Sequence, residues 1–341
     1  MLTTSRLPEK LEGEFFGVGS VGETEHSKPL TYVSRLALPY TFQIPSNKEE
    51  DMIRQFAVLI DGFEEEGDFL WEPDIHVYRE TLQSSDPLIP PRKNFPSLYS
   101  MVEKQEYSII KTQITAPVTM AYNIRSPDGK KLVSAPLLPF FEVLMKRIGE
   151  GIRSHLDNYA DEIVLCQDDP SMPFIFEDMR RGSLEEFGMK DLADSVDKIY
   201  PEKVIPAYHY CGDWRVAELK EHYLLWHGMS KIIHIDLISY PPEISNQHAE
   251  EMNRFMEKGG ALALGVIPNT DDGIKESVLQ DLRRNLHRTI DLFQEVGVDT
   301  DLLISNSMIS TQCGLSGASR VLTRKIHQLS EEYPDILKSF S

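Results

Sequence analysis

A histidine and a cysteine two residues apart are the first feature of this sequence that could do chemistry. His209 and Cys211 end the run VIPAYHYC (204–211), whose β-branched and aromatic residues predict a strand. Residues i and i+2 of a strand project to the same side, so we expect the imidazole and the thiol to point together. Imidazole nitrogen and thiolate sulfur are both metal ligands, zinc above all.

Two residues elsewhere could complete such a site. Cys313 lies in STQCGLSG (310–317), and Asp236 ends the strand-like run IIHID (232–236). With His209 and Cys211 they would offer one nitrogen, two sulfurs and one oxygen to a tetrahedral Zn²⁺. Each residue also has a plain structural interpretation, because cysteine often fills a core and a carboxylate can cap a loop. Cys166, inside a predicted strand, is expected to be such a core residue.

The strands that must position these side chains are short apolar runs between helix-sized segments. They number eight: 15–20, 40–44, 107–115, 162–167, 204–211, 231–238, 261–266 and 302–305. Strands alternating with helices predict a parallel sheet with right-handed crossovers. Eight such units close a (β/α)8 TIM barrel, whose active sites lie at the carboxyl ends of the strands. We therefore expect an α/β fold with a single barrel domain over 1–341; an open doubly wound sheet is the alternative.

Some segments have their own signals. The spacing of apolar residues predicts a helix from Asp272 to about Val296, capped by Asp271 or Asp272 and ended by Gly297, and another from about Ser316. The proline-rich stretch 64–97 is expected to be an irregular excursion from the barrel, such as a hairpin or lid. GVGSVG (17–22) has the spelling of a dinucleotide-binding loop, but no helix follows it, which makes the match weak.

Composition excludes several classes of protein. Of the 341 residues, 41% are hydrophobic and 26% charged, which suits a folded core. The net charge of −19 argues against nucleic acid or an anionic membrane as a partner. Three cysteines cannot form a disulfide framework. No secretory signal or run of about 20 apolar residues is found, so we expect a cytoplasmic protein.

The motifs together resemble the cobalamin-independent methionine synthase family, in a short form without the N-terminal half. That family is similar in fold to uroporphyrinogen decarboxylase and to the zinc-dependent methyltransferases of methanogens. The resemblance covers nearly the whole chain. It is carried by Val18-Gly19-Ser20, by QITAPVT (113–119) with Ala116 for glycine, by Asp168-Asp169-Pro170, by His209 with Cys211, and by Cys313-Gly314-Leu315.

The resemblance implies a zinc ion that activates a thiol substrate, homocysteine in the family. His209, Cys211 and Cys313 would be zinc ligands, and Asp236 stands where the family has a glutamate. Substrate contacts would fall on Val18, Ser20 and Asp168, with Asp168 facing the substrate ammonium.

The methyl donor and the acceptor stay open at this point. A methylated corrinoid, such as methylcobalamin or a corrinoid protein, has a better leaving group than methyl-folate and fits a chain with room for one barrel. Methyl-folate is the rival donor. A different thiol such as coenzyme M is the alternative acceptor, and a zinc-free decarboxylase related to uroporphyrinogen decarboxylase is the alternative enzyme.

Overall fold

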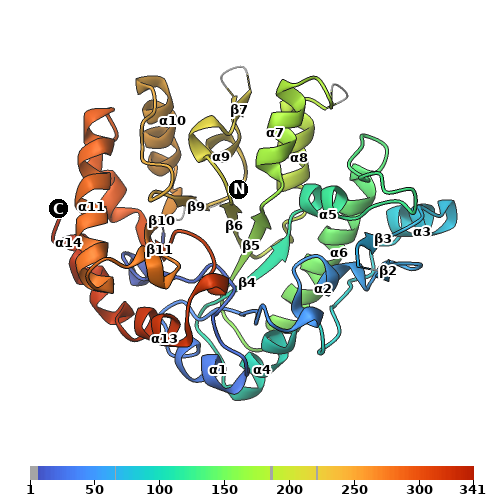
Figure 1. Ribbon diagram of the computed structural model, residues 1–341, viewed down its shortest axis with the longest axis horizontal. Coiled ribbons are helices and arrows are strands. Elements are labelled where there is room, and N and C mark those ends of the chain that lie inside the picture. Colours follow the sequence, from blue (N-terminus) through green and yellow to red (C-terminus); the bar gives the residue numbers. More distant parts are fainter. Residues whose placement is uncertain (1–6, 66, 185–186, 220–221) are drawn as a thin grey trace.

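Seven parallel strands form the centre of the molecule in the computed structural model, which describes residues 7–65, 67–184, 187–219 and 222–341. In spatial order the strands are β1 (Phe15–Phe16), β11 (Ser307–Thr311), β10 (Ala261–Ile267), β9 (Ile232–Asp236), β6 (Ile205–Tyr210), β5 (Ile163–Asp169) and β4 (Ile110–Thr115). The sheet curls, and helices surround it (Figure 1). An α/β fold with a curled parallel sheet is confirmed.

The helices cover the outer face of the sheet and a few short elements join them. They are α1 (Ser27–Val33), α2 (Arg54–Ala57), α3 (Ile75–Gln83), α4 (Pro96–Lys104), α5 (Pro117–Asn123), α6 (Leu138–Leu156), α7 (Met172–Arg180), α8 (Met189–Asp197), α9 (Leu224–His227), α10 (Asn246–Glu257), α11 (Val278–Glu295), α12 (Thr300–Ser305), α13 (Arg320–Gln328) and α14 (Tyr333–Lys338). Among the described residues, no helix is both long enough and apolar enough to cross a membrane.

The segment 40–44, predicted as a strand, bridges the two edges of the sheet instead of joining a ladder. Tyr40 makes an isolated parallel bridge to Lys111 of β4, and Gln43 makes one to Ser20 beyond β1. On the β4 side, the Thr41 amide donates to the Lys111 carbonyl at 2.9 Å; on the other side, the Gln43 amide donates to the Gly19 carbonyl at 3.1 Å. Among the described residues, the central sheet thus contains seven ladder strands, and this segment bridges its two edges.

The last strand lies beyond the place where it was predicted. The apolar run 302–305 is part of helix α12, which the Asp299 side chain caps by accepting from the Leu302 amide at 2.9 Å. The strand is β11, whose sequence SMIST is fully buried. Two of its hydroxyls have partners: Ser310 Oγ donates to the Phe16 carbonyl and Thr311 Oγ1 to the Cys313 carbonyl, each at 2.7 Å. The third, Ser307 Oγ, is buried without a hydrogen-bond partner among the described residues. The strand was not predicted because its buried hydroxyl side chains interrupt the apolar pattern, although hydrogen bonds allow two of them to be buried.

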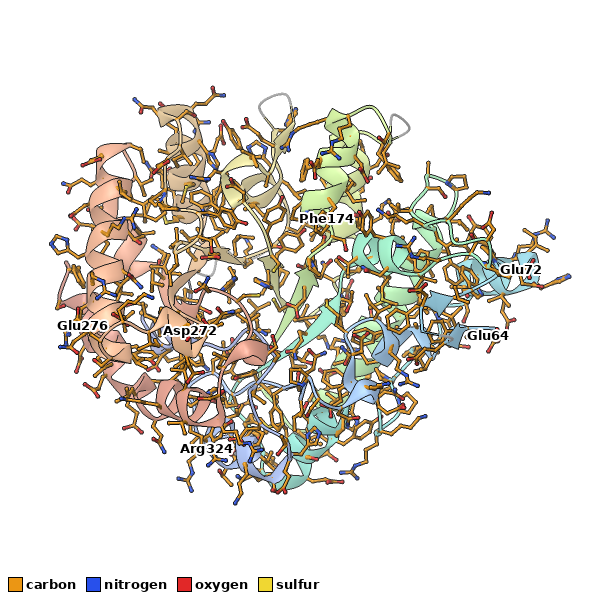
Figure 2. All side chains as sticks on the ribbon, viewed as in Figure 1. Glu64, Glu72, Phe174, Asp272, Glu276 and Arg324 are labelled. Carbon is orange, nitrogen blue, oxygen red and sulfur yellow. The ribbon has the colours of Figure 1, made fainter. Side chains whose placement is uncertain are left out.

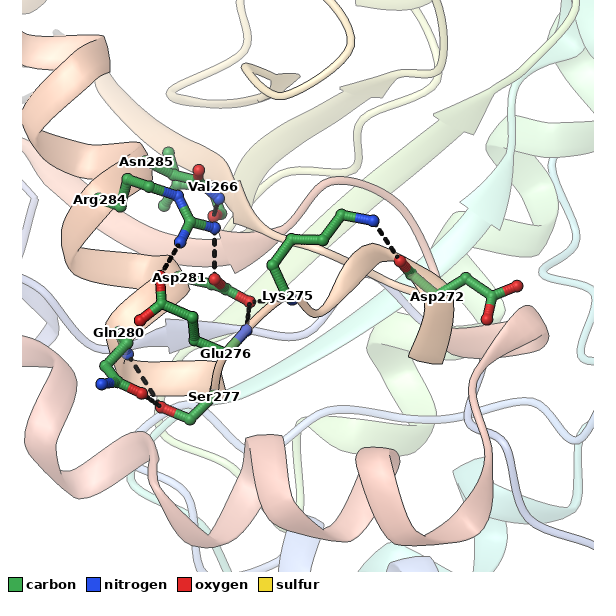
Figure 3. Close-up of polar contacts among 9 residues, drawn as sticks. All are labelled: Val266, Asp272, Lys275, Glu276, Ser277, Gln280, Asp281, Arg284 and Asn285. Atoms are coloured by element: carbon green, nitrogen blue, oxygen red, sulfur yellow. Dashed lines mark hydrogen bonds and ion pairs between the residues drawn. The ribbon is translucent and has the colours of Figure 1, made fainter.

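Helix α11 begins later than its apolar stripe predicted. Ser277, and not Asp271 or Asp272, caps it, while Asp271–Gly273 forms a separate 3-10 turn. The buried Asp281 carboxylate explains the shift, because it accepts from the Lys275 amide at 2.7 Å and pairs with Arg284, which fixes the incoming chain against the first turn (Figure 3).

The end of α11 and the start of α13 lie closer to their predicted positions. Gly297 has φ +90° just past α11, a left-handed conformation in which glycine carries no steric cost. Helix α13 starts after Ser319, whose hydroxyl accepts from the Leu322 amide at 3.1 Å, a few residues beyond the expected start near Ser316.

The excursion at 64–97 contains the antiparallel pair β2 (Glu64–Glu65) and β3 (Phe69–Leu70), followed by α3. Its labelled acids Glu64 and Glu72 lie at the edge of the molecule, away from the central strands (Figure 2). Trp71 is buried and stacks on Phe140 of α6 with ring centroids 4.5 Å apart, which anchors the excursion to the helical layer.

The core has two parts. The larger lies between the sheet and its helices, and the smaller fills the inside of the sheet near the amino ends of the strands. Leu7, Leu11, Phe16 and Cys166 belong to this inner cluster. Cys166 is thus packed as a core residue.

A buried hydrogen bond secures the bridging segment, and we expect its loss to be costly. His327 Nδ1 lies 2.6 Å from the Thr323 carbonyl, so this nitrogen donates and Nε2 accepts from the Tyr40 hydroxyl at 2.7 Å. Burial lowers the pKa of His327 to about 4, which keeps this ring neutral. Tyr40→Phe leaves Nε2 without a donor and should lower the free energy of unfolding in urea by about 1–3 kcal/mol. The control Tyr78→Phe, whose hydroxyl contacts the Pro136 carbonyl at the surface, should change it by less than about 0.5 kcal/mol. Equal effects of the two variants would contradict this account.

Candidate metal centre

Three neighbouring strands bring polar side chains side by side at the carboxyl end of the sheet. In the ladder, Asp168 of β5 is in register with His209 of β6, which in turn is in register with His234 of β9. Cys211 follows the last residue of β6, and Cys313 follows β11 in the next loop. Parallel strands end on one side of a sheet, so these residues share that side.

His209, Cys211 and Cys313 form a compact group of ligand atoms. The two sulfurs are 3.5 Å apart, Cys313 Sγ is 3.6 Å from His209 Nε2, and all three atoms lie within 4.8 Å of one another. His209 is buried, whereas both cysteines are partly exposed. Among the described residues, this is the group of histidine, cysteine and acidic side chains that could hold a metal ion.

A glycine follows each cysteine because the chain passes close to another segment there. A Cβ on Gly212 would lie 2.4 Å from Pro173 Cγ, at the start of α7. A Cβ on Gly314 would lie 2.2 Å from Ser20 Oγ. These approaches press the two cysteine loops against α7 and against the turn after β1, which fixes where both sulfurs lie.

The two thiols share one proton in the metal-free protein. The hydrogen bond from Cys211 is the largest influence on Cys313 and lowers its pKa; His209 and the Gly314 amide act in the same direction. The same bond, together with burial, raises the pKa of Cys211. Cys313 is therefore the thiolate and Cys211 the donor. Cys166 differs from both, because burial raises its pKa and keeps its thiol neutral.

His234, which the sequence analysis did not assign, completes a chain of hydrogen bonds behind His209. His209 Nδ1 lies 2.6 Å from His234 Nδ1, and His234 Nε2 lies 2.8 Å from the Thr311 carbonyl. Both rings are buried, and burial is the main reason why the pKa of His234 falls well below its usual value. Strand alternation could have indicated this residue, because His234 and Asp236 share a face of the same strand.

Asp236 lies at the edge of this centre and outside the compact group. Its Oδ1 accepts from the amides of Ile238 and Ser239, each at 2.9 Å, so it holds the turn after β9. Burial raises the pKa of Asp236, and the charge of Cys313 contributes to the shift. The carboxylate thus lies near the sulfurs, and its role as a ligand stays a prediction.

The residues expected to contact substrate lie around the same mouth. Ser20, partly exposed, faces Gly314 beside Cys313. Asp168 is partly exposed next to His209; burial raises the pKa of its carboxyl, and the charges of Lys111 and His209 oppose that shift. Val18 is buried, and its carbonyl accepts a hydrogen bond.

The donor to Val18 is a lysine that the sequence analysis did not single out. Lys111 of β4 is fully buried inside the sheet, and its Nζ donates to the Val18 carbonyl at 2.8 Å. The ammonium also lies 4.9 Å from the centre of the Phe16 ring. Aromatic faces attract cations, so this ring and the carbonyl stabilise the buried charge.

Asp169, the second acid of the Asp-Asp-Pro motif, is a buried hydrogen-bond acceptor that joins neighbouring segments. Its carboxylate accepts from Thr119 Oγ1 at 2.6 Å and from the Tyr208 hydroxyl at 2.8 Å. Thr119 ends the QITAPVT motif and lies in α5, so the contact ties α5 to the last residue of β5.

Comparison with known proteins gives structural likeness alone. No family model and no curated protein matches the sequence. The chain is similar to a methionine synthase. This is a B12-independent methionine synthase from Shewanella sp. W3-18-1, with 15% identity and a TM-score of 0.45 over 68% of this chain and 62% of that one. It is also similar to a methyltransferase from Methanosarcina mazei, with 12% identity and a TM-score of 0.45 over 95% of this chain and 94% of that one. The chain thus spans 62% of the length of the synthase.

The lowered pKa of Cys313 predicts its reactivity in protein stripped of metal with a chelator. An ordinary thiol, with a pKa of about 8.5, loses its thiolate as the pH falls from 8 to 6. Cys313 should keep its thiolate over this range, so its alkylation by iodoacetamide should change little, as measured by peptide mass spectrometry. Cys166, buried and neutral, should stay unlabelled.

Cys211→Ala is the control for this measurement, because it removes the hydrogen bond that lowers the pKa of Cys313 most. In that variant the alkylation of Cys313 should slow as the pH falls. A wild-type rate with an inflection near about pH 8.5 would show that the thiol is unperturbed.

Proposed function

We propose that this chain is a zinc-dependent thiol S-methyltransferase on a (β/α)8 barrel, and that it methylates homocysteine to methionine. The convergence of His209, Cys211 and Cys313 carries the proposal. The sulfurs come from positions 102 residues apart, yet they lie 3.5 Å from each other beside one imidazole. The resemblance of the surrounding motifs to the methionine synthase family supports the choice of reaction.

The donor set suits zinc. In a tetrahedral site with Zn–S of about 2.3 Å and Zn–N of about 2.0 Å, two sulfurs lie about 3.8 Å apart and a sulfur and a nitrogen about 3.5 Å apart. The observed separations are 3.5 Å and 3.6 Å. Two sulfurs and an imidazole also favour zinc over the hard cations calcium and magnesium, which prefer oxygen.

Asp236 is the proposed fourth protein ligand. Its negative charge contributes to the raised pKa of Cys211 and its own pKa responds to Cys313, so it lies within electrostatic reach of both sulfurs. The turn that Oδ1 holds through Ile238 and Ser239 keeps the carboxylate close to the group.

Bound zinc would keep the substrate thiol deprotonated, and the thiolate is the nucleophile. The residues of the chain then orient the amino acid. Asp168 faces the substrate ammonium, and Ser20 with the backbone at Val18 contacts the rest of the molecule. In-line attack of the thiolate on the methyl carbon depends more on how the two reactants are positioned than on acid–base catalysis.

A methyl-corrinoid is the proposed donor. The thiolate sulfur attacks the methyl carbon, a C–S bond forms, the C–Co bond breaks, and its electron pair stays on cobalt as Co(I). This leaving group requires no proton, whereas the N5 amine of methyl-folate must be protonated as it leaves. Methyl-folate is the rival donor.

Metal analysis of untagged protein tests the centre directly. Wild-type protein should hold about one zinc per chain, and Cys211→Ala and Cys313→Ala should each lose most of it, because each removes one sulfur ligand. Cys166→Ala is the matched control, since Cys166 is packed in the inner core, and it should keep the zinc. Protein without stoichiometric metal would contradict the proposal and favour the decarboxylase alternative.

Asp168→Ala separates homocysteine from other thiols. It removes the carboxylate that faces the ammonium, so KM for homocysteine should rise about tenfold or more with a smaller change in kcat. A thiol without an amino group, such as coenzyme M, should be affected little. Activity with wild-type protein on coenzyme M alone would overturn the homocysteine assignment.

The same assay, run with each donor in turn, identifies the methyl source. Methionine formed from methylcobalamin, and not from methyl-folate, is the expected result. Methionine from methyl-folate alone would exclude the corrinoid.

A further inference from the structure

We propose that His234 is a positioning residue that holds His209 in the tautomer protonated at Nδ1, so that Nε2 presents its lone pair to the metal. The inference rests on the proposed metal centre and adds to it a residue that does not touch the ion. It follows from the hydrogen bonds behind His209.

The Thr311 carbonyl determines which atom donates in both hydrogen bonds of the series His209–His234–Thr311. The Thr311 carbonyl can only accept, so His234 Nε2, at 2.8 Å, carries the hydrogen. A neutral imidazole has one donor and one acceptor, which makes His234 Nδ1 the acceptor. His209 Nδ1, at 2.6 Å, must therefore donate. In a neutral His209 this leaves Nε2 with the lone pair that a metal would take. Without metal, the same nitrogen can carry a second hydrogen toward Cys313 Sγ, 3.6 Å away, which agrees with the effect of His209 on the pKa of Cys313.

The surroundings of His234 favour the neutral ring on which this reasoning depends. Its side chain is fully buried and stacks on Phe16, with ring centroids 6.1 Å apart. The same Phe16 ring also contacts a charge, because the buried ammonium of Lys111 lies 4.9 Å from its centroid. Among the described residues, the hydrogen bonds of His234 go to His209 and Thr311, so a second buried cation here would have no carboxylate partner among them.

Thr311 links two ligands that come from distant parts of the chain. Its carbonyl accepts from His234, which orients His209, and its hydroxyl donates to the Cys313 carbonyl at 2.7 Å. Thr311, the last residue of β11, thus contacts both the His234 imidazole and the loop of Cys313. Partners that orient a metal-binding histidine typically change metal affinity by 10–100-fold when they are removed.

Two variants of His234 test the role. His234→Leu has similar volume but no acceptor, so zinc affinity measured by competition with a chelator should fall about 10–100-fold. His234→Asn offers an amide oxygen near the place of Nδ1 and should recover part of that loss. Thr311→Val keeps the backbone carbonyl that His234 needs and removes only the hydroxyl bond to Cys313, so any loss of zinc affinity in this variant measures the contribution of the cysteine loop and not that of the His209 tautomer.

The tautomer itself is read by NMR, independently of activity. In protein labelled with ¹⁵N-histidine, the long-range proton–nitrogen spectrum of the zinc form should show His209 protonated at Nδ1 and metal-bound at Nε2. His209→Gln identifies its signals. Thr311→Val should leave this pattern unchanged, whereas His234→Leu should alter it.

A protein that cannot hold metal separates this inference from the proposed function. In Cys211→Ser/Cys313→Ser, His209 should still carry its hydrogen on Nδ1, because His234 accepts it there. That result supports the inference even if wild-type protein binds no zinc or transfers no methyl group. A neutral His209 protonated at Nε2 alone in this variant, or a His234→Leu protein with wild-type zinc affinity, would overturn it. If His234→Leu does not fold, the wild-type and double-serine spectra decide.

Discussion

The parallel register of β5, β6 and β9 determines where the candidate centre forms. It places Asp168, His209 and His234 in one row across three neighbouring strands. The backbone ladder therefore fixes the spacing of a carboxylate and two imidazoles before any side-chain contact is made. The cysteines join this row from loops, and their position depends on tight packing, with Gly212 against Pro173 and Gly314 against Ser20.

Much of the fold followed from local sequence because the strands are apolar runs. Six of the eight predicted runs overlap strands of the central sheet. The run 40–44 joins no ladder, but it lies between β1 and β4, the two strands that the barrel prediction placed on either side of it. The last strand was mispredicted for a physical reason: 302–305 is more apolar than β11, but its apolar side chains belong to a helix, whereas β11 buries hydroxyls, of which those of Ser310 and Thr311 have hydrogen-bond partners. The partner of Ser310, the Phe16 carbonyl, lies 294 residues away in sequence, so local sequence could not indicate it.

The candidate site was predictable to the extent that its residues carry recognisable chemistry. His209, Cys211 and Cys313 were expected together, and the structure places them together. His234 and Lys111 were missed because a lone histidine or lysine in a strand carries no local signal; the role of each appears only when the neighbouring strand is in place. Asp236 has a second role that its residue type did not indicate, because its Oδ1 also holds the turn after β9, and its role as a ligand stays a prediction.

The bridging segment 40–44 gives the two sides of the mouth unequal rigidity. A ladder strand carries His209 and ends directly before Cys211, whereas the turn at Val18–Ser20 is joined to the bridging segment through an isolated bridge at Ser20. Fewer consecutive backbone bonds must open to separate this seam than to separate two ladder strands. Because Gly314 packs against Ser20, a movement of this turn would reach the loop of Cys313, whereas the ladder that carries His209 would keep its register.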